Sequence, residues 1–256
     1  MRKSFLTVLF LLVVAYAGIC AYLYSQQRAL LYLPQFTRVA ASNTDFKLVR
    51  DGVSLRGWVV NPGQPRAILY FGGNGESVQN NRTSFAQWFP SQTVYLLAYR
   101  GYGASDGTPN EAQLFADALA LYDDVHAAHP AMPLSVIGRS LGSGVASYVA
   151  SKRPLARLAL VTPFDSMAEV AQSHYPWLPV RALVKDRYDS DRYLTTFRGP
   201  VLIVRAGHDE VIGWERTQHL IEVLPQPPQV LELPNAGHNS VQEFPEYEHA
   251  LETFFH

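Results

Sequence analysis

The sequence has one cysteine among 256 residues and almost no net charge, with 21 Lys and Arg against 22 Asp and Glu. One cysteine cannot form a disulfide within the chain, and zinc sites built from cysteines need more than one. A net charge of −1 without a block of like charges gives no electrostatic footprint for nucleic acid, so we expect no nucleic-acid partner. Because 48% of the residues are apolar and only 17% are charged, an intrinsically disordered chain is excluded and a packed core is expected.

Charge is also missing from one long stretch near the N-terminus. No charged residue occurs between Lys3 and Arg28, and 18 of the 20 residues at positions 5–24 are apolar. Twenty helical residues reach about 30 Å, which is roughly the thickness of the hydrocarbon core of a bilayer. We therefore predict a signal anchor or transmembrane helix in residues 1–27.

The flanks of this stretch predict its orientation. Arg2 and Lys3 should stay in the cytoplasm, which places the rest of the chain outside it, in the periplasm if the source is bacterial. A cleaved signal peptide and a secreted form are the alternative, because residues 15–17 read Ala-Tyr-Ala, the form of a cleavage site. The apolar run continues to Tyr24, beyond that site, and this favours an uncleaved anchor.

The remaining chain alternates short apolar runs with amphipathic stretches and has no repeat or linker that would divide it. Two strand-like runs separated by the turn pair Asp51 and Gly52 predict an antiparallel hairpin. Six continuous apolar runs follow, as expected for parallel strands buried on both faces. The pattern predicts an α/β fold over residues 28–256, with a mostly parallel central sheet and helices on both faces. The expected strands are 45–50, 53–60, 67–71, 93–99, 134–137, 158–161, 201–204 and 230–233.

A serine flanked by glycines marks one junction between a strand and a helix. Residues 138–142 read Gly-Arg-Ser-Leu-Gly, directly after the apolar run 134–137 and at the start of a helical pattern. This is the pattern of a nucleophile elbow, in which side chains two positions from the serine would clash, so Ser140 is the predicted nucleophile. A second match, at residues 103–107, lies in a loop several residues past its strand, and we expect its Ser105 to belong to a structural turn.

A serine hydroxyl needs a positioned base and an acid that orients the base. Among eight histidines, His238 alone lies in a Gly-containing loop between a late strand and the last helix, so it is the predicted base. Asp209 follows the strand at 201–204 and precedes the histidine, the order found in this architecture. Asp165, after the strand at 158–161, is the alternative acid; we favour Asp209 and expect Asp165 to cap the segment that follows it.

A glycine-rich loop ends the strand at 67–71. Residues 71–76 read Phe-Gly-Gly-Asn-Gly-Glu, without the Gly-Lys-Ser/Thr of a phosphate loop or the last glycine of a dinucleotide fingerprint. In a serine hydrolase such a loop supplies one backbone N–H to the oxyanion, and the residue after the nucleophile supplies the other. The predicted donors are Asn74 and Leu141, each worth on the order of 3 kcal/mol in the transition state. We expect no cofactor and no metal.

Five further motifs are more specific than the serine pentapeptide. They are Arg-Ala-Leu-Leu-Tyr-Leu-Pro at 28–34, Tyr-Arg-Gly-Tyr-Gly-Ala-Ser-Asp-Gly at 99–107, Thr-Pro-Phe-Asp-Ser at 162–166, Tyr-Pro-Trp-Leu-Pro at 175–179 and Asp-Glu-Val-Ile at 209–212. With them the chain resembles the α/β-hydrolase superfamily, specifically its membrane-anchored branch of α/β-hydrolase domain-containing proteins and their bacterial relatives. The resemblance implies an α/β-hydrolase fold and the triad Ser140, Asp209 and His238. The branch usually has His-Gly where this chain has Gly-Gly at 72–73. Because the oxyanion donor is a backbone N–H group, this difference in side chain keeps it.

These features predict a serine hydrolase that cleaves a carboxylic ester or thioester through an acyl-enzyme. We expect a small-molecule or lipid-like acyl substrate, held under a short cap at about 163–199 where Tyr175 and Trp177 contact the acyl group. The alternative for these aromatics is a place in the core. Two other functions stay open, a peptidase of the serine aminopeptidase type and a non-catalytic, membrane-tethered binding protein on a hydrolase fold.

Overall fold

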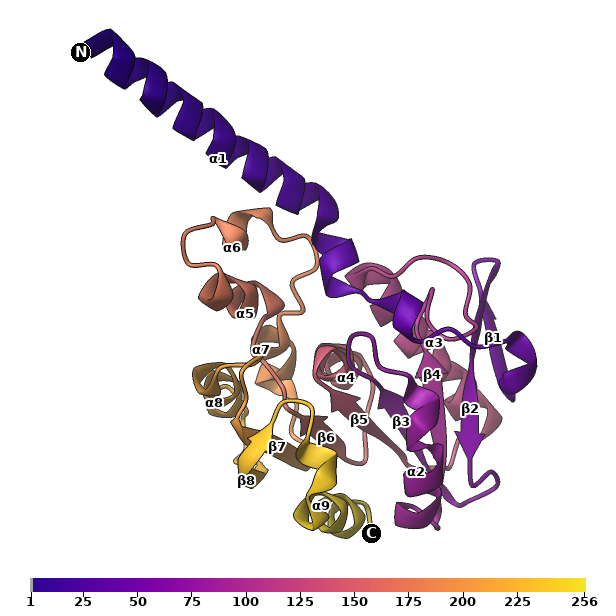
Figure 1. The fold of residues 1–256 in the computed structure, drawn as a ribbon. Helices are drawn as coiled ribbons and strands as arrows, with labels where there is room; N and C mark the ends of the chain where they lie inside the picture. Colours follow the sequence, from indigo (N-terminus) through magenta and orange to yellow (C-terminus); the bar gives the residue numbers. More distant parts are fainter. Residues whose placement is uncertain (1) are drawn as a thin grey trace.

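A computed structural model describes residues 2–256 and contains one eight-stranded sheet of order β1-β2-β4-β3-β5-β6-β7-β8. The pairs β1–β2 and β2–β4 are antiparallel, and all other neighbours are parallel. The predicted mostly parallel sheet with an antiparallel start is therefore confirmed (Figure 1). The strands are β1 (Phe46–Arg50), β2 (Val53–Val60), β3 (Arg66–Phe71), β4 (Gln92–Ala98), β5 (Leu134–Arg139), β6 (Leu158–Val161), β7 (Val201–His208) and β8 (Gln229–Gly237).

Burial explains the two kinds of strand sequence. The central strands β3, β5 and β6 are buried along almost their whole length, because helices cover both faces of the sheet, and their sequences are accordingly unbroken apolar runs. The edge strand β1 alternates half-buried and exposed residues, as one solvated face requires.

Helices lie in front of and behind the sheet in Figure 1. On one face α2 packs against α9 through the rings of Trp88 and Tyr247, whose centroids are 5.8 Å apart. On the other face α3 and α4 lie side by side, with the rings of Phe115 and Tyr148 stacked at 4.0 Å. The helices of this body are α2 (Arg82–Trp88), α3 (Glu111–Ala128), α4 (Leu141–Lys152), α5 (Met167–His174), α6 (Val180–Leu183), α7 (Ser190–Tyr193), α8 (Trp214–Glu222) and α9 (Pro245–Phe255).

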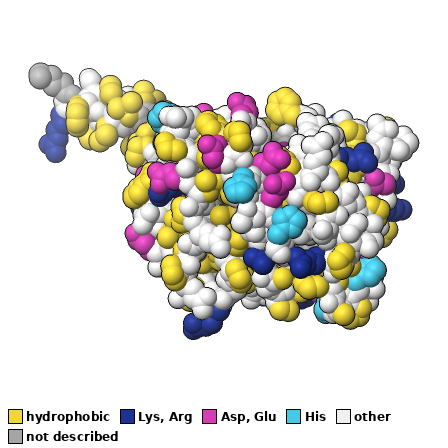
Figure 2. Space-filling view, turned by 90° about the horizontal axis from the view of Figure 1, so that it is seen from below, with side chains coloured by type: hydrophobic (Ala, Val, Ile, Leu, Met, Phe, Trp, Pro, Cys, Tyr) yellow, Lys and Arg dark blue, Asp and Glu magenta, His cyan; other side chains and the backbone are white. Residues whose placement is uncertain are grey.

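The first helix, α1 (Arg2–Leu31), projects from this body (Figure 1) and has no buried residue. Along the described residues it is the one helix long and apolar enough to cross a membrane. Figure 2 shows hydrophobic side chains along the projecting part and Lys or Arg side chains near its far end. The helix continues past residue 27, so its last turn lies in the segment that the sequence assigns to the catalytic domain.

The segment between β6 and β7 forms a small cap, here called the cap segment (residues 163–199). It contains three short helices, α5, α6 and α7. Figure 1 shows α5 and α6 beside the C-terminal half of α1. The cap segment therefore lies between the projecting helix and the carboxyl ends of the parallel strands.

Candidate active site

Ser140 stands at the turn between β5 and α4 in a backbone conformation that a serine rarely adopts, with φ 49° and ψ −118°. The flanking glycines make this turn possible. A Cβ atom at Gly142 would collide with the carbonyl group of Phe71, and one at Gly138 would collide with the carbonyl group of Gly142. The structure thus has the strained strand-to-helix turn that the pentapeptide predicts.

The three residues of the predicted triad form one hydrogen-bonded chain. The Nε2 atom of His238 lies 2.8 Å from Oγ of Ser140. Its Nδ1 atom lies 2.8 Å from Oδ2 and 3.0 Å from Oδ1 of Asp209. The backbone N–H groups of Val211 and Ile212 donate to Oδ1 of Asp209 at 2.9 and 2.7 Å, which holds the carboxylate in place. Ser140 and His238 are both buried, so water has little access to the bond between them.

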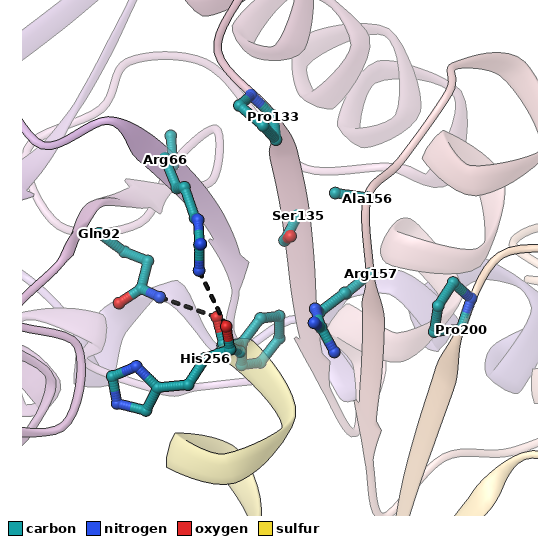
Figure 3. Close-up of a pocket in the computed structure, with 10 residues that line it drawn as sticks. Arg66, Gln92, Pro133, Ser135, Ala156, Arg157, Pro200 and His256 are labelled. Carbon is teal, nitrogen blue, oxygen red and sulfur yellow. Dashed lines mark hydrogen bonds between the residues drawn. The ribbon is translucent and has the colours of Figure 1, made fainter.

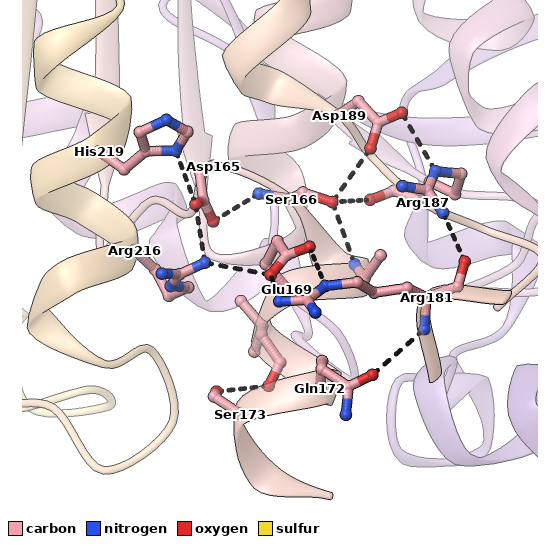
Figure 4. A network of polar contacts seen from close by, with 12 residues as sticks. Asp165, Ser166, Glu169, Gln172, Ser173, Arg181, Arg187, Asp189, Arg216 and His219 are labelled. Atoms are coloured by element: carbon pink, nitrogen blue, oxygen red, sulfur yellow. Dashed lines mark hydrogen bonds and ion pairs between the residues drawn. The ribbon is translucent and has the colours of Figure 1, made fainter. Parts of the chain in front are cut away.

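Asp165, the alternative acid, belongs to a different network, which joins the cap segment to α8 (Figure 4). Its carboxylate accepts the backbone N–H of Ser166 at 2.7 Å and pairs with Arg216 at 3.1 Å and with Nδ1 of His219 at 3.0 Å. Burial raises the pKa of Asp165 despite these partners. The expectation that Asp165 caps the next helix is corrected, because the N-cap of α5 is Ser166, whose Oγ accepts the N–H of Ala168.

Ser105, the second serine between glycines, is buried in a structural turn. Its hydroxyl donates to the carbonyl of Ala98 at 2.7 Å and accepts the backbone N–H of Arg56 at 2.8 Å. These bonds tie the loop to β2 and β4 and occupy the hydroxyl group. Ser105 therefore belongs to a structural turn, as the sequence predicts.

The glycine-rich loop passes directly beside Ser140. A Cβ atom built on Gly73 would lie 3.5 Å from Cβ of Ser140. The N–H of Gly73 donates to Oε2 of Glu76 at 2.6 Å, so it is occupied. The backbone N–H groups of Asn74 and Leu141 have no acceptor within residues 2–256. Both predicted oxyanion donors are thus left available for another acceptor.

Glu76 and Arg139 hold this loop, and sequence reasoning missed both. The Glu76 carboxylate accepts bonds from the Tyr70 hydroxyl at 2.6 Å and from the Asn81 amide at 2.8 Å, and it pairs with Arg139 at 3.2 Å. Arg139 also donates to Oδ1 of Asn239, next to the predicted base, at 3.3 Å. The sequence offers only one hint of their role, their position beside the predicted site residues. Glu76 ends the glycine-rich loop, and Arg139 precedes Ser140.

A groove of about 370 Å³ lies between α1 and the cap segment; we call it the anchor groove. Its apolar lining includes Leu23, Leu30 and Leu31 of α1 and Ala171, Leu178 and Leu183 of the cap segment. Tyr175, one of the two predicted pocket residues, lines the groove. Trp177 is not among its lining residues; its ring lies instead 6.4 Å from that of Tyr16 on α1.

A second cavity, of about 320 Å³, lies at the amino ends of the parallel strands (Figure 3). There Arg66 donates to the backbone carbonyl of His256 at 3.0 Å, and Gln92 donates to that of Phe255 at 2.9 Å. These bonds fix the C-terminal helix. Because Ser140 follows the carboxyl end of β5, this cavity is at the opposite edge of the sheet from the triad. Within the described part of the chain, no cluster of His, Cys, Asp and Glu is suited to a metal ion.

Comparison with known proteins agrees with the fold and the family. A family model described as serine aminopeptidase, S33, matches residues 63–190. The uncharacterized protein Rv2307c of Mycobacterium tuberculosis is 32% identical over 251 residues, which cover 93% of this chain and 89% of that protein. The lysophosphatidylserine lipase ABHD12 of Danio rerio is 29% identical over 180 residues, covering 62% of this chain and 47% of that protein.

Solved structures show the same fold at low sequence identity. The esterase Pf2001 of Pyrococcus furiosus has a TM-score of 0.66 and 18% identity, over 83% of this chain and 91% of that one. Est1E of Butyrivibrio proteoclasticus, with ferulic acid bound, has a TM-score of 0.67 and 16% identity, over 82% and 98%. The chain is therefore an α/β hydrolase and belongs to the family described as serine aminopeptidase, S33.

Proposed function

We propose that this α/β hydrolase is a serine hydrolase that cleaves carboxylic ester or thioester bonds through an acyl-enzyme. The observation that carries the proposal is the hydrogen-bonded chain from Ser140 through His238 to Asp209, with both bonds of His238 at 2.8 Å. Nucleophile, base and orienting acid need this mutual geometry. The esterases of the same fold and the lipase relative support an ester rather than another bond.

The reaction follows from the positions of the groups. His238 takes the Ser140 proton on Nε2 while Oγ attacks the substrate carbonyl carbon, and the N–H groups of Asn74 and Leu141 hold the resulting oxyanion. His238 then gives the proton to the departing alcohol or thiol, which leaves the acyl group on Ser140. A water molecule, deprotonated by the same imidazole, releases the carboxylic acid. No cofactor or metal takes part in this scheme.

The location of the enzyme is part of the proposal. We take α1 as an uncleaved membrane anchor, with Arg2 and Lys3 on the cytoplasmic side and the hydrolase body on the other. The contacts between α1 and the cap segment support retention of the helix. Gln27 donates to the carbonyl of Leu183 at 3.2 Å and accepts the N–H of Lys185 at 2.6 Å. Cleavage after residue 17 would leave the rest of the apolar run, residues 18–24, as a new N-terminus beside the cap segment.

A peptidase acting on free N-termini would need an acidic group for the substrate amine. The one acidic residue that lines the anchor groove is Asp186, and Arg28 already pairs with it at 2.9 and 3.0 Å. This favours an ester or thioester over a peptide. Hydrolysis of an N-terminal aminoacyl anilide at a higher kcat/KM than that of an activated ester would reverse the preference.

The decisive experiment is covalent labelling of the full chain with a fluorophosphonate. The serine oxygen of an activated serine attacks the phosphorus of the reagent and displaces fluoride, which leaves a phosphonate ester, so we expect a single labelled peptide containing Ser140. Ser140→Ala should abolish labelling and lower the rate on an activated ester by several orders of magnitude, while the matched variant Ser105→Ala stays near wild type. Equal loss in both variants, or an unlabelled wild-type chain, would favour a non-catalytic binding protein instead.

A further inference from the structure

The cap segment contacts α1 at two levels. At the first level the Lys185 amine donates to the carbonyl of Tyr24 at 3.0 Å and lies 3.9 Å from the centre of its ring. At the second level the Tyr16 hydroxyl donates to the carbonyl of Trp177 at 2.9 Å. Tyr16 precedes Tyr24 by two helical turns, which is about 12 Å along the axis. The tip of the cap segment therefore reaches about 12 Å further toward the N-terminal end of the anchor than Lys185 does.

This position is incompatible with a cap that lies wholly in water. If the whole cap segment stayed in water, the membrane surface would lie beyond its tip. Only residues 5–15 of the apolar run would then remain in the bilayer. Eleven helical residues reach about 16 Å, roughly half of the hydrocarbon thickness that a spanning helix must cross. The tip of the cap segment must therefore enter the membrane leaflet on the side of the hydrolase body.

The chemistry of the tip fits such a position. Tyr175 and Trp177 expose 51% and 57% of their surface, although both are large aromatic residues. The cations Arg181 and Lys185 follow them in the cap segment; Lys185 lies at the level of Tyr24, and Arg181 pairs with Glu169 at 2.6 Å. Aromatic rings at the acyl boundary with cations on the water side are the composition of a segment that lies in a membrane interface.

The anchor groove begins between the levels of Tyr16 and Tyr24, and its lining on α1 ends at Leu31, next to the glycine-rich loop. Its lining on α1 extends from Cys20 to Leu31, about 16 Å along the helix. At the inner end, the carbonyl of Leu31 accepts a hydrogen bond from the side-chain amide of Asn74 at 3.3 Å. Asn74 is also a proposed oxyanion donor, so this hydrogen bond links the last lining residue of the groove to the loop beside Ser140. Its one carboxylate, Asp186, is paired with Arg28, which leaves no free charge for a polar ligand.

We propose that the anchor groove binds the acyl chain of a membrane amphiphile, which enters sideways from the leaflet that the cap tip occupies. The inference rests on the proposed hydrolase function and adds the substrate class and its binding site. The membrane anchor thereby forms one wall of the substrate site. A volume of about 370 Å³ with mainly apolar walls is within the range of small-ligand sites.

The test uses the full chain in phosphatidylcholine vesicles and a long-chain alkyl fluorophosphonate with a diazirine at the chain end. Phosphonylation, with loss of fluoride, fixes the probe on Ser140. Light then converts the diazirine, with loss of nitrogen gas, into a carbene that inserts into the nearest side chain. We expect cross-linked peptides from Cys20–Leu31 and from the cap segment. Cross-links confined to other parts of the body would overturn the groove assignment while leaving the labelling of Ser140 intact.

Two tryptophan variants give a second readout. Ala171→Trp fills the groove from α5, and Ala29→Trp adds the same bulk to an exposed position of α1 outside the lining. We expect Ala171→Trp to slow labelling by the long-chain probe about ten-fold or more, with no change for an ethyl fluorophosphonate, and Ala29→Trp to change neither. Equal long-chain rates in both variants would contradict the proposal. If neither probe labels the wild-type chain, the hydrolase function itself fails, and the substrate assignment fails with it.

Discussion

The hydroxyl groups of Tyr32 and Tyr188 lie 2.6 Å apart and connect the end of α1 to the cap segment. Tyr188 packs on Gly144 of α4, where a Cβ atom would come within 2.8 Å of the ring. Asp186 accepts from the Tyr32 hydroxyl at 3.1 Å and from Arg28 at 2.9 Å. Burial raises the pKa of both tyrosines, so both stay protonated at neutral pH. The anchor is thus connected to the active-site region through a buried polar cluster.

Removing the charge at Asp186 should loosen this connection. The Asp186 side chain is only 4% exposed, whereas Asp123, which forms the same two-bond pair with Arg153, is 51% exposed. Asp186→Asn should lower the free energy of unfolding by about 2 kcal/mol, because Arg28 loses a desolvated partner but stays partly hydrated. Asp123→Asn should cost less than about 1 kcal/mol. Thermal unfolding of both variants in detergent tests this, and equal shifts would contradict it.

The strand prediction succeeds where burial is complete and falls short at the polar end of β7, beside the edge strand β8. Runs at 158–161 and 134–137 match β6 and the body of β5, because strands buried on both faces must be apolar throughout. The strand β7 continues past residue 204 to His208, which pairs with Gly237 beyond a bulge. Its polar end breaks the apolar pattern, and only the pairing with β8 makes it a strand.

In the candidate site, only residues that are marked by their neighbours in the sequence could be predicted. Ser140 is marked by its own neighbours, since the glycines that the turn requires lie two residues away. The pair between Glu76 and Arg139 spans 63 residues, and the pair between Asp165 and His219 spans 54, so no local pattern reveals either. The contact of Trp177 with the anchor joins residues 161 apart, and it places this ring beside α1 rather than in the groove.

The two candidate acids can be separated by matched amide variants. In Asp209→Asn the amide cannot stabilise the imidazolium form of His238, so kcat on an activated ester should fall by about four orders of magnitude. Asp165→Asn breaks the pairs with Arg216 and His219, which join the cap segment to α8, but leaves the predicted triad intact. Its kcat should stay near wild type while its unfolding temperature falls. A larger loss of kcat in Asp165→Asn would make Asp165 the acid.

Glu76 should act by positioning the oxyanion loop. Glu76→Ala removes the acceptor that fixes the Gly73 N–H at 2.6 Å, and Asn74 follows directly in the chain. We expect kcat to fall by about ten- to a hundred-fold with little change in KM, because the oxyanion forms only in the transition state. Glu76→Gln keeps a carbonyl acceptor for Gly73 and should recover most of the rate. A rise in KM alone, or equal rates for both variants, would argue against this role.

The stability of the cap segment should depend on pH through Glu111. This carboxylate accepts the backbone N–H groups of Arg187 and Tyr188 at 2.9 and 2.8 Å, yet burial outweighs these bonds and raises its pKa. The folded chain therefore holds this proton more tightly than the unfolded chain does. The resulting stabilisation is complete below the ordinary glutamate pKa of about 4.3 and is lost as pH rises through the raised value.

Glu111→Gln removes this titration from the folded and the unfolded chain alike. The difference in unfolding temperature between wild type and Glu111→Gln should therefore move in favour of the variant between about pH 4 and pH 7. Asp124→Asn, an exposed substitution on the same helix, should follow the wild-type profile. Thermal unfolding of the three chains in detergent across this range measures the effect. A difference that stays constant with pH would mean that the folded state holds the Glu111 proton no more tightly than water does, despite its burial behind the cap segment.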